Sequence, residues 1–388
     1  MTRPRLSQSH PLRRVHFICQ TLGIGGAEQV NRDMLEALQD RGIKVQAFVT
    51  FARFAEMLQE KKIPVHRLPV VLDIIGNWKG LVKAAVLWPF GVVQYLWTVW
   101  QSKDADVIVM SGFIEKILVT PLARLWKIPV IWIEFAPLGP VFRKFAGLPE
   151  YLYRAVLGLP ATVIVPTPYT QRFFIEEVGV EPRRLHILQC ARYKLNIEKY
   201  LKISPFSNFT VVCVSRMEKG KGQDLLVQAF VEVVKQAPGA RLVFAGEGEF
   251  ETEVRQVVAA YHLEDNVEFR GRVADPLELM ARATVCVFPS VWSLEGFGLV
   301  TIEAMALAKP IVAFDCGPTP EMVENGKTGL LAEKGNVAEL AQKILIILKQ
   351  PHRAAELGRN AQQVYRSRYR FETIIDEYIS VFAKVSNA

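Results

Sequence analysis

Two glutamates bracket a glycine-rich turn in the second half of the sequence. Glu295 precedes Gly298, and Glu303 lies within the apolar run that begins at Leu299 and predicts a helix. Glycine lets the backbone approach a ligand closely, and the free N–H groups of a helix start attract anions, phosphate above all. The pattern favours a phosphate-bearing ligand whose hydroxyl groups the glutamates hold. The alternative is a capped helix with a solvated glutamate at each end.

A basic loop provides the opposite charge. Val211–Val214 predicts a strand, Arg216 follows its end, and Lys219 and Lys221 precede a helical pattern. Cations at a strand end and before a helix could clamp a diphosphate and stabilise a leaving group that gains negative charge. Spacing alone does not choose between the two lysines, and a solvated basic loop is the alternative.

Other tight turns follow predicted strands, where open α/β sheets bind ligands. They contain Gly25 and Gly26, Gly246, and Arg272 with Val273. The first turn does not complete a dinucleotide-binding fingerprint, because Glu28 stands where the last glycine is needed. No P-loop pattern occurs, so hydride transfer with a dinucleotide and P-loop NTP hydrolysis are both disfavoured.

Strand-like and helix-like segments alternate along the chain, which predicts an α/β protein with parallel sheets. Its 388 residues suggest two domains, and two Rossmann-like halves fit. We expect a basic flexible segment at 1–14, domains at 15–203 and 204–368, and a C-terminal helix at 369–388. The expected strands are Val15–Thr21, Lys44–Thr50, Asp106–Ser111, Pro129–Ile133, Ala161–Pro166, Phe209–Ser215, Arg241–Ala245, Val267–Arg270, Val285–Phe288 and Pro310–Phe314.

The charge of the chain is unevenly distributed. The net charge is +8, and residues 1–103 hold 14 Lys and Arg against 7 Asp and Glu. An anionic membrane or nucleic acid could attract such a surface, but basic stripes interleaved with stacking aromatics are not evident, so the membrane is favoured. The five cysteines are scattered, which is typical of reduced core residues in a cytosolic protein. We expect a cytoplasmic protein at the inner face of the membrane.

With these motifs the chain resembles the retaining glycosyltransferases of family 4, the glycosyl transferases group 1. The resemblance covers nearly the whole chain and is most specific at 211–336. It implies the GT-B fold, in which two Rossmann-like domains face each other and the C-terminal helix crosses back to the N-terminal domain. It further implies transfer of a sugar from a nucleotide diphosphate donor, with retention at the anomeric carbon and no metal or redox cofactor.

The resemblance assigns roles to individual residues. Glu295 and Glu303 match a Glu-x7-Glu pair that holds the donor sugar's hydroxyls and the nucleotide ribose. Arg216 and Lys221 match the cations that hold the diphosphate, and the spacing to Gly222 selects Lys221 over Lys219. The catalytic residues are therefore expected to be Glu295, Arg216 and Lys221. The expected donor-binding residues are Gly25, Gly26, Gly246, Arg272, Val273, Phe297, Gly298, Leu299 and Glu303.

One position departs from the family pattern. After the predicted strand Pro129–Ile133, Phe135 takes the place of a histidine that the family often carries there. Glu134 could replace that histidine on the acceptor side, or it could be an ordinary loop carboxylate. Asp104 and Asp106 precede their strand, so we expect solvated side chains there and no metal site.

The acceptor is expected to be lipid-linked or a glycan, in cell-envelope, glycolipid or polysaccharide synthesis. No enzymatic nucleophile is evident beside Glu295, so a front-face reaction follows from the resemblance. A sugar-nucleotide epimerase of the same fold and a non-catalytic membrane-associated scaffold are the alternatives. The sequence does not indicate the oligomeric state.

The segment 79–102 is strongly apolar. Its few polar residues include Lys83, Gln94 and Thr98, and Pro89 is expected to break or kink it. Three interpretations compete: an interfacial helix on an anionic membrane, a helix pair packed under the N-terminal sheet, and a transmembrane span. The first, favoured by the tryptophans and the basic excess, predicts peripheral membrane contact and a lipid-linked acceptor.

Overall fold

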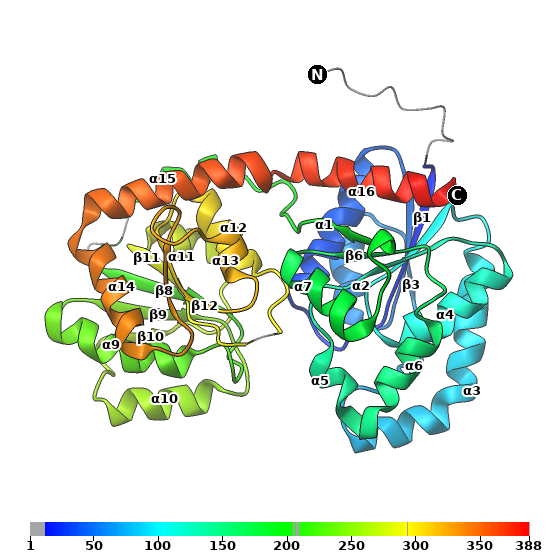
Figure 1. Ribbon diagram of the computed structural model, residues 1–388, viewed down its shortest axis with the longest axis horizontal. Coiled ribbons are helices and arrows are strands. Elements are labelled where there is room, and N and C mark those ends of the chain that lie inside the picture. The colour runs from blue at the N-terminus through cyan, green and yellow to red at the C-terminus, as the bar shows by residue number, and fades with distance from the viewer. Residues whose placement is uncertain (1–11, 205, 207–208, 293, 388) are drawn as a thin grey trace. The chain divides into compact units, whose positions relative to one another are not determined.

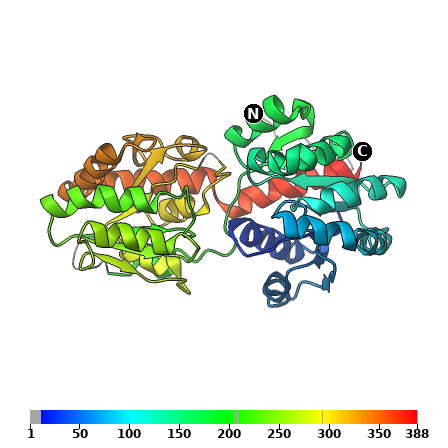
Figure 2. The same ribbon diagram turned by 90° about the horizontal axis from the view of Figure 1, so that it is seen from below.

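The computed structural model describes residues 12–204, 206, 209–292 and 294–387 and divides into two compact units. The first contains the chain up to Tyr193 together with the residues from Phe371 onward, and the second is Lys194–Arg370. The boundaries expected from the sequence, at 203–204 and 368–369, differ from these divisions by ten and two residues (203 against 193, 368 against 370). Most of the expected flexible segment 1–14 lies outside the described residues. Each unit is built on one parallel sheet (Figures 1 and 2).

The sheet of the first unit has seven strands in the order β3-β2-β1-β4-β5-β6-β7. Its central strands are short apolar runs that are buried on both faces, as parallel strands covered by helices must be. The strands are β1 (Arg14–Cys19), β2 (Lys44–Val49), β3 (Val65–Arg67), β4 (Val107–Met110), β5 (Val130–Ile133), β6 (Thr162–Val165) and β7 (Leu185–Ile187).

Helices cover both faces of this sheet. One hydrophobic core lies under α1, α2 and α16, and the other lies under α3, α4 and α6. The C-terminal helix α16 contributes Phe371, Ile375 and Phe382 to the first core, so the chain end returns to the N-terminal unit as predicted. The helices are α1 (Gly26–Asp40), α2 (Ala52–Gln59), α3 (Trp78–Gln101), α4 (Ile114–Leu125), α5 (Gly139–Phe142), α6 (Leu148–Val156), α7 (Pro168–Phe173) and α16 (Phe371–Ser386).

The second unit has a six-stranded parallel sheet in the order β10-β9-β8-β11-β12-β13. Its strands are β8 (Thr210–Val214), β9 (Arg241–Ala245), β10 (Val267–Phe269), β11 (Val285–Phe288), β12 (Ile311–Asp315) and β13 (Leu330–Glu333). Its helices are α8 (Glu198–Leu201), α9 (Gln223–Gln236), α10 (Glu251–Ala260), α11 (Pro276–Arg282), α12 (Leu299–Ala306), α13 (Thr319–Met322), α14 (Val337–Lys349) and α15 (Pro351–Arg368).

Both sheets reverse their strand order at one point. In the first sheet β1 lies between β2 and β4, and in the second β8 lies between β9 and β11. The loops that leave the two middle strands at such a switch point run to opposite sides, and the crevice between them is where open α/β sheets bind ligands. The fold therefore offers one such position in each unit.

The predicted α/β class and two parallel sheets are confirmed, and ten strands were predicted within one or two residues of their observed ends. The predicted strands omitted the short β3 and β7, at the two edges of the first sheet, and β13 at an edge of the second. Of the break or kink expected at Pro89, the break is wrong, because α3 runs through it as one helix. Pro89 is exposed, and the carbonyl that lacks its N–H donor belongs to Ala85, which is exposed as well.

Candidate functional site

The loop from β8 to α9 is fixed at the start of the helix. Gly222 caps α9 with a φ of 74°, and a Cβ there would lie 1.9 Å from the carbonyl oxygen of Pro289. The side-chain amide of Gln223 donates from Nε2 to the backbone carbonyl of Arg216 at 2.8 Å. Only glycine fits this approach of two backbones, and the resulting turn determines where Lys221 points.

Lys221 and Glu295 meet at the switch point of the second sheet. Lys221 Nζ lies 2.5 Å from Glu295 Oε2 and 4.9 Å from the centre of the Trp292 ring. Ser290 Oγ donates to the same carboxylate oxygen at 3.3 Å. The two charged side chains are only 13% and 21% exposed, so their positions are well defined by their surroundings. Two of the three predicted catalytic residues are thus in contact.

The other basic residues of the loop lie differently. Arg216 is 57% exposed and pairs with Glu218 at 2.6 Å. Lys219 is exposed. The structure therefore places Lys221, and not Lys219, beside Glu295, while Arg216 stands at the end of β8 with its guanidinium accessible from solvent.

The glycine-rich turn leads into α12 as expected. Gly298 has a φ of 74° and caps the helix, so Leu299 begins the first turn. The N–H of Thr301 donates to the Gly298 carbonyl at 2.9 Å, whereas the N–H groups of Leu299 and Val300 have no intrahelical acceptor. Glu303 lies one turn further and is buried. Phe297 is also buried and contacts the ring of Tyr369 edge-on at 5.9 Å, which leaves its backbone rather than its ring available to a ligand.

The turns after β9 and β10 lie at the same edge of the sheet. Gly246 has a φ of 140°, and a Cβ there would lie 1.9 Å from the carbonyl oxygen of Ser215. The backbone N–H of Arg272 donates to Glu247 Oε1 at 3.2 Å, while the Arg272 side chain is exposed and Val273 is half-buried. These turns therefore border the loop that carries Arg216 and Lys221.

In the first unit, the turn at Gly25 and Gly26 begins α1. Glu28 accepts two hydrogen bonds at this helix start: the N–H of the N-cap residue Gly25 donates to Glu28 Oε2 and the hydroxyl of Thr21 to Glu28 Oε1, each at 2.8 Å. The carboxylate of Glu28 thus stabilises the helix start.

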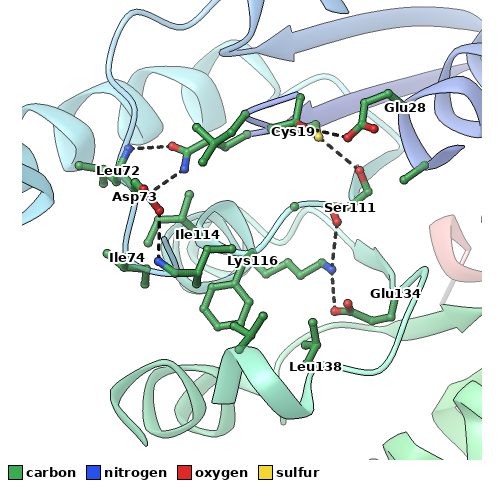
Figure 3. Close-up of a pocket in the computed structure, with 18 residues that line it drawn as sticks. Cys19, Glu28, Leu72, Asp73, Ile74, Ser111, Ile114, Lys116, Glu134 and Leu138 are labelled. Carbon is green, nitrogen blue, oxygen red and sulfur yellow. Dashed lines mark hydrogen bonds and ion pairs between the residues drawn. The ribbon is translucent and has the colours of Figure 1, made fainter. Parts of the chain in front are cut away.

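A cavity of about 300 Å³ lies at the switch point of the first sheet (Figure 3). Residues 19–22, 72–75 and 111–114 form much of its wall, together with Lys116, Glu134, Leu138 and Val141. The wall combines polar groups from the ends of β1, β4 and β5 with apolar side chains from α5. Such a combination suits a ligand with both hydroxyl groups and apolar surface.

Lys116 and Glu134 form a buried ion pair in this wall. Lys116 Nζ donates to Glu134 Oε1 at 2.6 Å and to the carbonyl of Ile133 at 2.9 Å, and the hydroxyl of Tyr153 donates to Glu134 Oε1 at 2.7 Å. Burial raises the pKa of Glu134, and both partners act against that rise. Phe135 instead packs half-buried against the core under α1 and α16. Of the two expected acceptor-side residues, Glu134 lines the cavity.

Sequence reasoning missed Lys116. The available signal was the Glu115-Lys116 pair at the start of the otherwise mostly apolar α4. Glu115 is fully buried and accepts from the N–H of Gly112 at 2.6 Å, and burial raises its pKa to about 7.

The two aspartates before β4 fasten the start of β1. Asp106 Oδ2 accepts from the N–H groups of Arg13 and Arg14 at 2.6 and 2.7 Å, and Asp104 pairs with the Arg14 side chain. Asp106 is therefore a structural residue and not a solvated one, because the backbone of β1 uses its carboxylate.

Two models of known protein families match this chain, one in each unit. The model described as glycosyl transferases group 1 matches residues 197–364, and the model of a glycosyl transferase 4-like domain matches residues 25–191. The fold is also that of solved structures: the Anabaena protein HepE, crystallised with UDP, has a TM-score of 0.80 at 22% identity, over 96% of this chain and 100% of that one.

Three relatives indicate the range of activities. A glycosyltransferase of Haemophilus influenzae is 30% identical over 95% of this chain and 99% of its own length. An N-acetyl-alpha-D-glucosaminyl L-malate synthase of Bacillus anthracis is 30% identical over 45% of each chain. A GDP-mannose-dependent phosphatidylinositol monomannoside mannosyltransferase of Mycobacterium tuberculosis is 32% identical over 50% of this chain. The matches to the last two span about half the length of those enzymes, 45% and 52%.

Proposed function

The chain belongs to the group 1 glycosyltransferases of the family 4 type, and on that premise we propose that it moves a sugar from a nucleotide-diphosphate sugar to an acceptor hydroxyl, with retention at the anomeric carbon. The observation that carries the proposal is the contact between Lys221 and Glu295 at the switch point of the second sheet. A cation and a hydroxyl-binding carboxylate held together there suit the two halves of a sugar diphosphate.

The positive charges suit the diphosphate. Lys221 is held in place by Glu295 and Trp292, and Arg216 is accessible at the end of β8. The N-terminus of α12 adds the N–H groups of Leu299 and Val300, which have no intrahelical acceptor. Negative charge on the diphosphate grows as the sugar leaves, so these contacts strengthen in the transition state and accelerate the reaction. Because side chains and a helix terminus supply the charge, we propose that transfer continues in the presence of EDTA.

The carboxylates suit the hydroxyl groups of the donor. We assign Glu295 to the sugar and Glu303, one turn into α12, to the ribose of the nucleotide. The remaining donor contacts are assigned to the backbone at residues 297–299 and to the turns at Gly246, Arg272 and Val273. The glycine turn at Gly25 and Gly26 is assigned to the donor as well.

The proposed chemical step takes place on one face of the sugar. The bond between the anomeric carbon and the diphosphate oxygen breaks, and the acceptor oxygen bonds to the same face of that carbon. The acceptor's proton passes to the oxygen of the departing nucleoside diphosphate, so charge and atoms balance. Lys221 and Arg216 stabilise the departing group, and Glu295 supports the positive charge that develops on the sugar ring.

We assign the acceptor to the cavity of the N-terminal unit. Its wall offers polar groups near Glu134 and Lys116 and apolar side chains at Leu138 and Val141. The Mycobacterium tuberculosis relative is named for a glycolipid acceptor, and a Staphylococcus aureus relative is named for capsular polysaccharide biosynthesis. These names support an acceptor that is lipid-linked or a glycan, in the synthesis of the cell envelope or its polysaccharides.

A panel of UDP-, GDP- and ADP-sugars, incubated with the protein in EDTA, tests the proposal through release of nucleoside diphosphate and free or transferred sugar. We expect slow hydrolysis of at least one donor without acceptor, and hydrolysis by Lys221→Ala that is roughly 10²-fold slower or more. Interconversion of two sugar nucleotides without loss of the diphosphate would instead identify an epimerase. No turnover of any donor, with or without membrane lipids, would favour a scaffold.

A further inference from the structure

The helix α3 turns two of its polar side chains inward and a row of apolar side chains outward. Gln94 and Thr98 are buried, whereas Val86 and Val93 are well exposed. The usual surface helix has the opposite arrangement. Figure 1 shows α3 at the edge of the N-terminal unit, beside α4.

The exposed apolar side chains form one continuous face. At 100° per residue they fall within an arc of about 120°, and the face runs the whole length of the 24-residue helix. We call this set the α3 apolar face; each member is between 37% and 69% exposed: Trp78, Val82, Val86, Phe90, Val93, Leu96, Trp97 and Trp100. An apolar surface this long marks an interaction site rather than scattered exposure.

Hydrogen bonds hold the helix in this orientation. The side-chain amide of Gln94 accepts from the N–H of Val70 at 2.8 Å and donates to the Val70 carbonyl at 3.0 Å. It thus satisfies both backbone groups of Val70, as the backbone of a neighbouring strand would. On the same side, Gly91 lies so close to Leu72 that a Cβ would be 2.5 Å from its side chain. Rotating the helix to bury its apolar face would break these bonds and lose this packing.

The charge around the α3 apolar face identifies the partner. From residue 74 to residue 103 the chain contains no Asp or Glu, while Lys79, Lys83 and Lys103 are all exposed. Lysines beside an apolar face, with tryptophans near both helix ends, match the surface of a bilayer that contains anionic lipid. A second copy of the chain would instead bring these lysines toward one another.

We propose that the α3 apolar face seats the N-terminal unit on an anionic lipid bilayer, so that the cavity of this unit takes its acceptor from the bilayer. This inference rests on the proposed function for the role of the cavity. One wall of the cavity, residues 72–75, leads directly into α3. Lys144 Nζ donates to the Gly76 carbonyl at 3.2 Å, and Trp78 contacts Phe145 edge-on at 5.1 Å. The connection between the cavity wall and α3 is therefore packed against the segment that follows α5.

The helix lies on the bilayer and does not cross it. Among the described residues, α3 is the one helix long and apolar enough to span a membrane, but a third of its most apolar window is buried inside the unit. Tyr95, Thr98 and Val99 are completely buried against the sheet. Crossing would remove them from the core, whereas lying on the surface leaves them in place. The cytoplasmic leaflet, which carries anionic lipid, is the bilayer surface that fits.

Flotation with vesicles tests the proposal. The full chain is mixed with vesicles of phosphatidylcholine alone or with about one third phosphatidylglycerol, and compared with the double variant Val86→Asp/Val93→Asp. The control variant is Tyr261→Asp, which places one such charge at an exposed aromatic residue of the other unit. We expect the wild type and Tyr261→Asp to float with anionic vesicles, and the double variant to lose at least tenfold in its partition.

Three results would overturn the proposal: wild type that stays at the bottom with both vesicles, equal flotation of the double variant, or a dimer in vesicle-free buffer that the double variant dissociates. Hydrolysis of the nucleotide sugar without vesicles serves as a separate readout. We expect it to be unchanged in the double variant. A protein that hydrolyses donor but does not float would contradict only the membrane proposal, and one that floats but hydrolyses no donor would contradict only the proposed function.

Discussion

Lys219 and Lys221 carry the same charge on the same loop, but only Lys221 contacts Glu295. We therefore expect Lys221→Ala to lower kcat/KM for donor turnover by roughly 10²-fold or more, because the departing diphosphate loses its positioned cation. Lys219→Ala is the matched control and should remain within about twofold of wild type. Equal losses in the two variants, measured as nucleoside diphosphate release, would remove the assignment of Lys221.

Glu115 gives the chain a pH-dependent stability. Burial raises its pKa from 4.5 to about 7, so the folded state retains a proton that the unfolded state releases. The contribution of the protonated carboxyl is fully present below about pH 4.5 and is lost as the pH rises through 7. Glu115→Gln cannot lose a proton, so between pH 5 and 8 its free energy of unfolding should fall less than that of wild type, by up to about 3 kcal/mol. An equal fall in the free energy of unfolding of wild type and Glu115→Gln over this pH range, measured by chemical denaturation, would contradict this.

Residues close in sequence were easier to assign than residues brought together by the fold. The spacing of Glu295 and Glu303 around one turn, and of Lys221 before Gly222, is visible in the chain. Lys116 and Glu134 are 18 residues apart, on α4 and at the end of β5, so their ion pair depends on how helix and strand pack. In the sequence, Phe135 was the position that departed from the family pattern. Successive side chains of an extended segment point to opposite sides, and it is Glu134 that lines the cavity.

At the scale of elements, the start of α9 is the most constrained turn of the second unit. Gly222→Ala would force a Cβ into the carbonyl of Pro289 in a left-handed conformation. We expect it to destabilise the unit by about 2 kcal/mol or more, which lowers the thermal midpoint by roughly 4–8 °C. Gly239→Ala is the control, because no atom lies within 4 Å of a Cβ there. Similar midpoints for the two variants would contradict the close approach at Gly222.

Apolar runs and alternation of strands and helices were enough to predict ten of the strands. The three-residue strands β3 and β7 were missed although the equally short β10 was predicted, so length alone does not decide whether such a strand is recognised. Of the polar residues noted in α3, Gln94 and Thr98 point inward and Lys83 does not. The inward direction of Gln94 was not predictable, since the acceptor and donor that it satisfies belong to the backbone of Val70, far from it in the sequence.

At the scale of the whole chain, the family resemblance carried information that composition could not. The length suggested two domains, but the return of α16 to the N-terminal unit came from the resemblance, and the core residues of α16 confirm it. The identity of base, sugar and acceptor is not encoded in any of these features. Relatives that share the fold are named for different products, so substrate choice depends on side chains that the fold itself does not fix.

Retaining transfer from a nucleotide sugar held by Lys221 and Glu295 is tested by proton NMR of the anomeric signal during turnover of the preferred donor. We predict that the first product observed has the anomeric configuration of the donor, that nucleoside diphosphate is released in equal amount, and that Lys221→Ala forms both products roughly 10²-fold more slowly or slower still. A first product with inverted configuration, or unchanged turnover by Lys221→Ala, would exclude this mechanism.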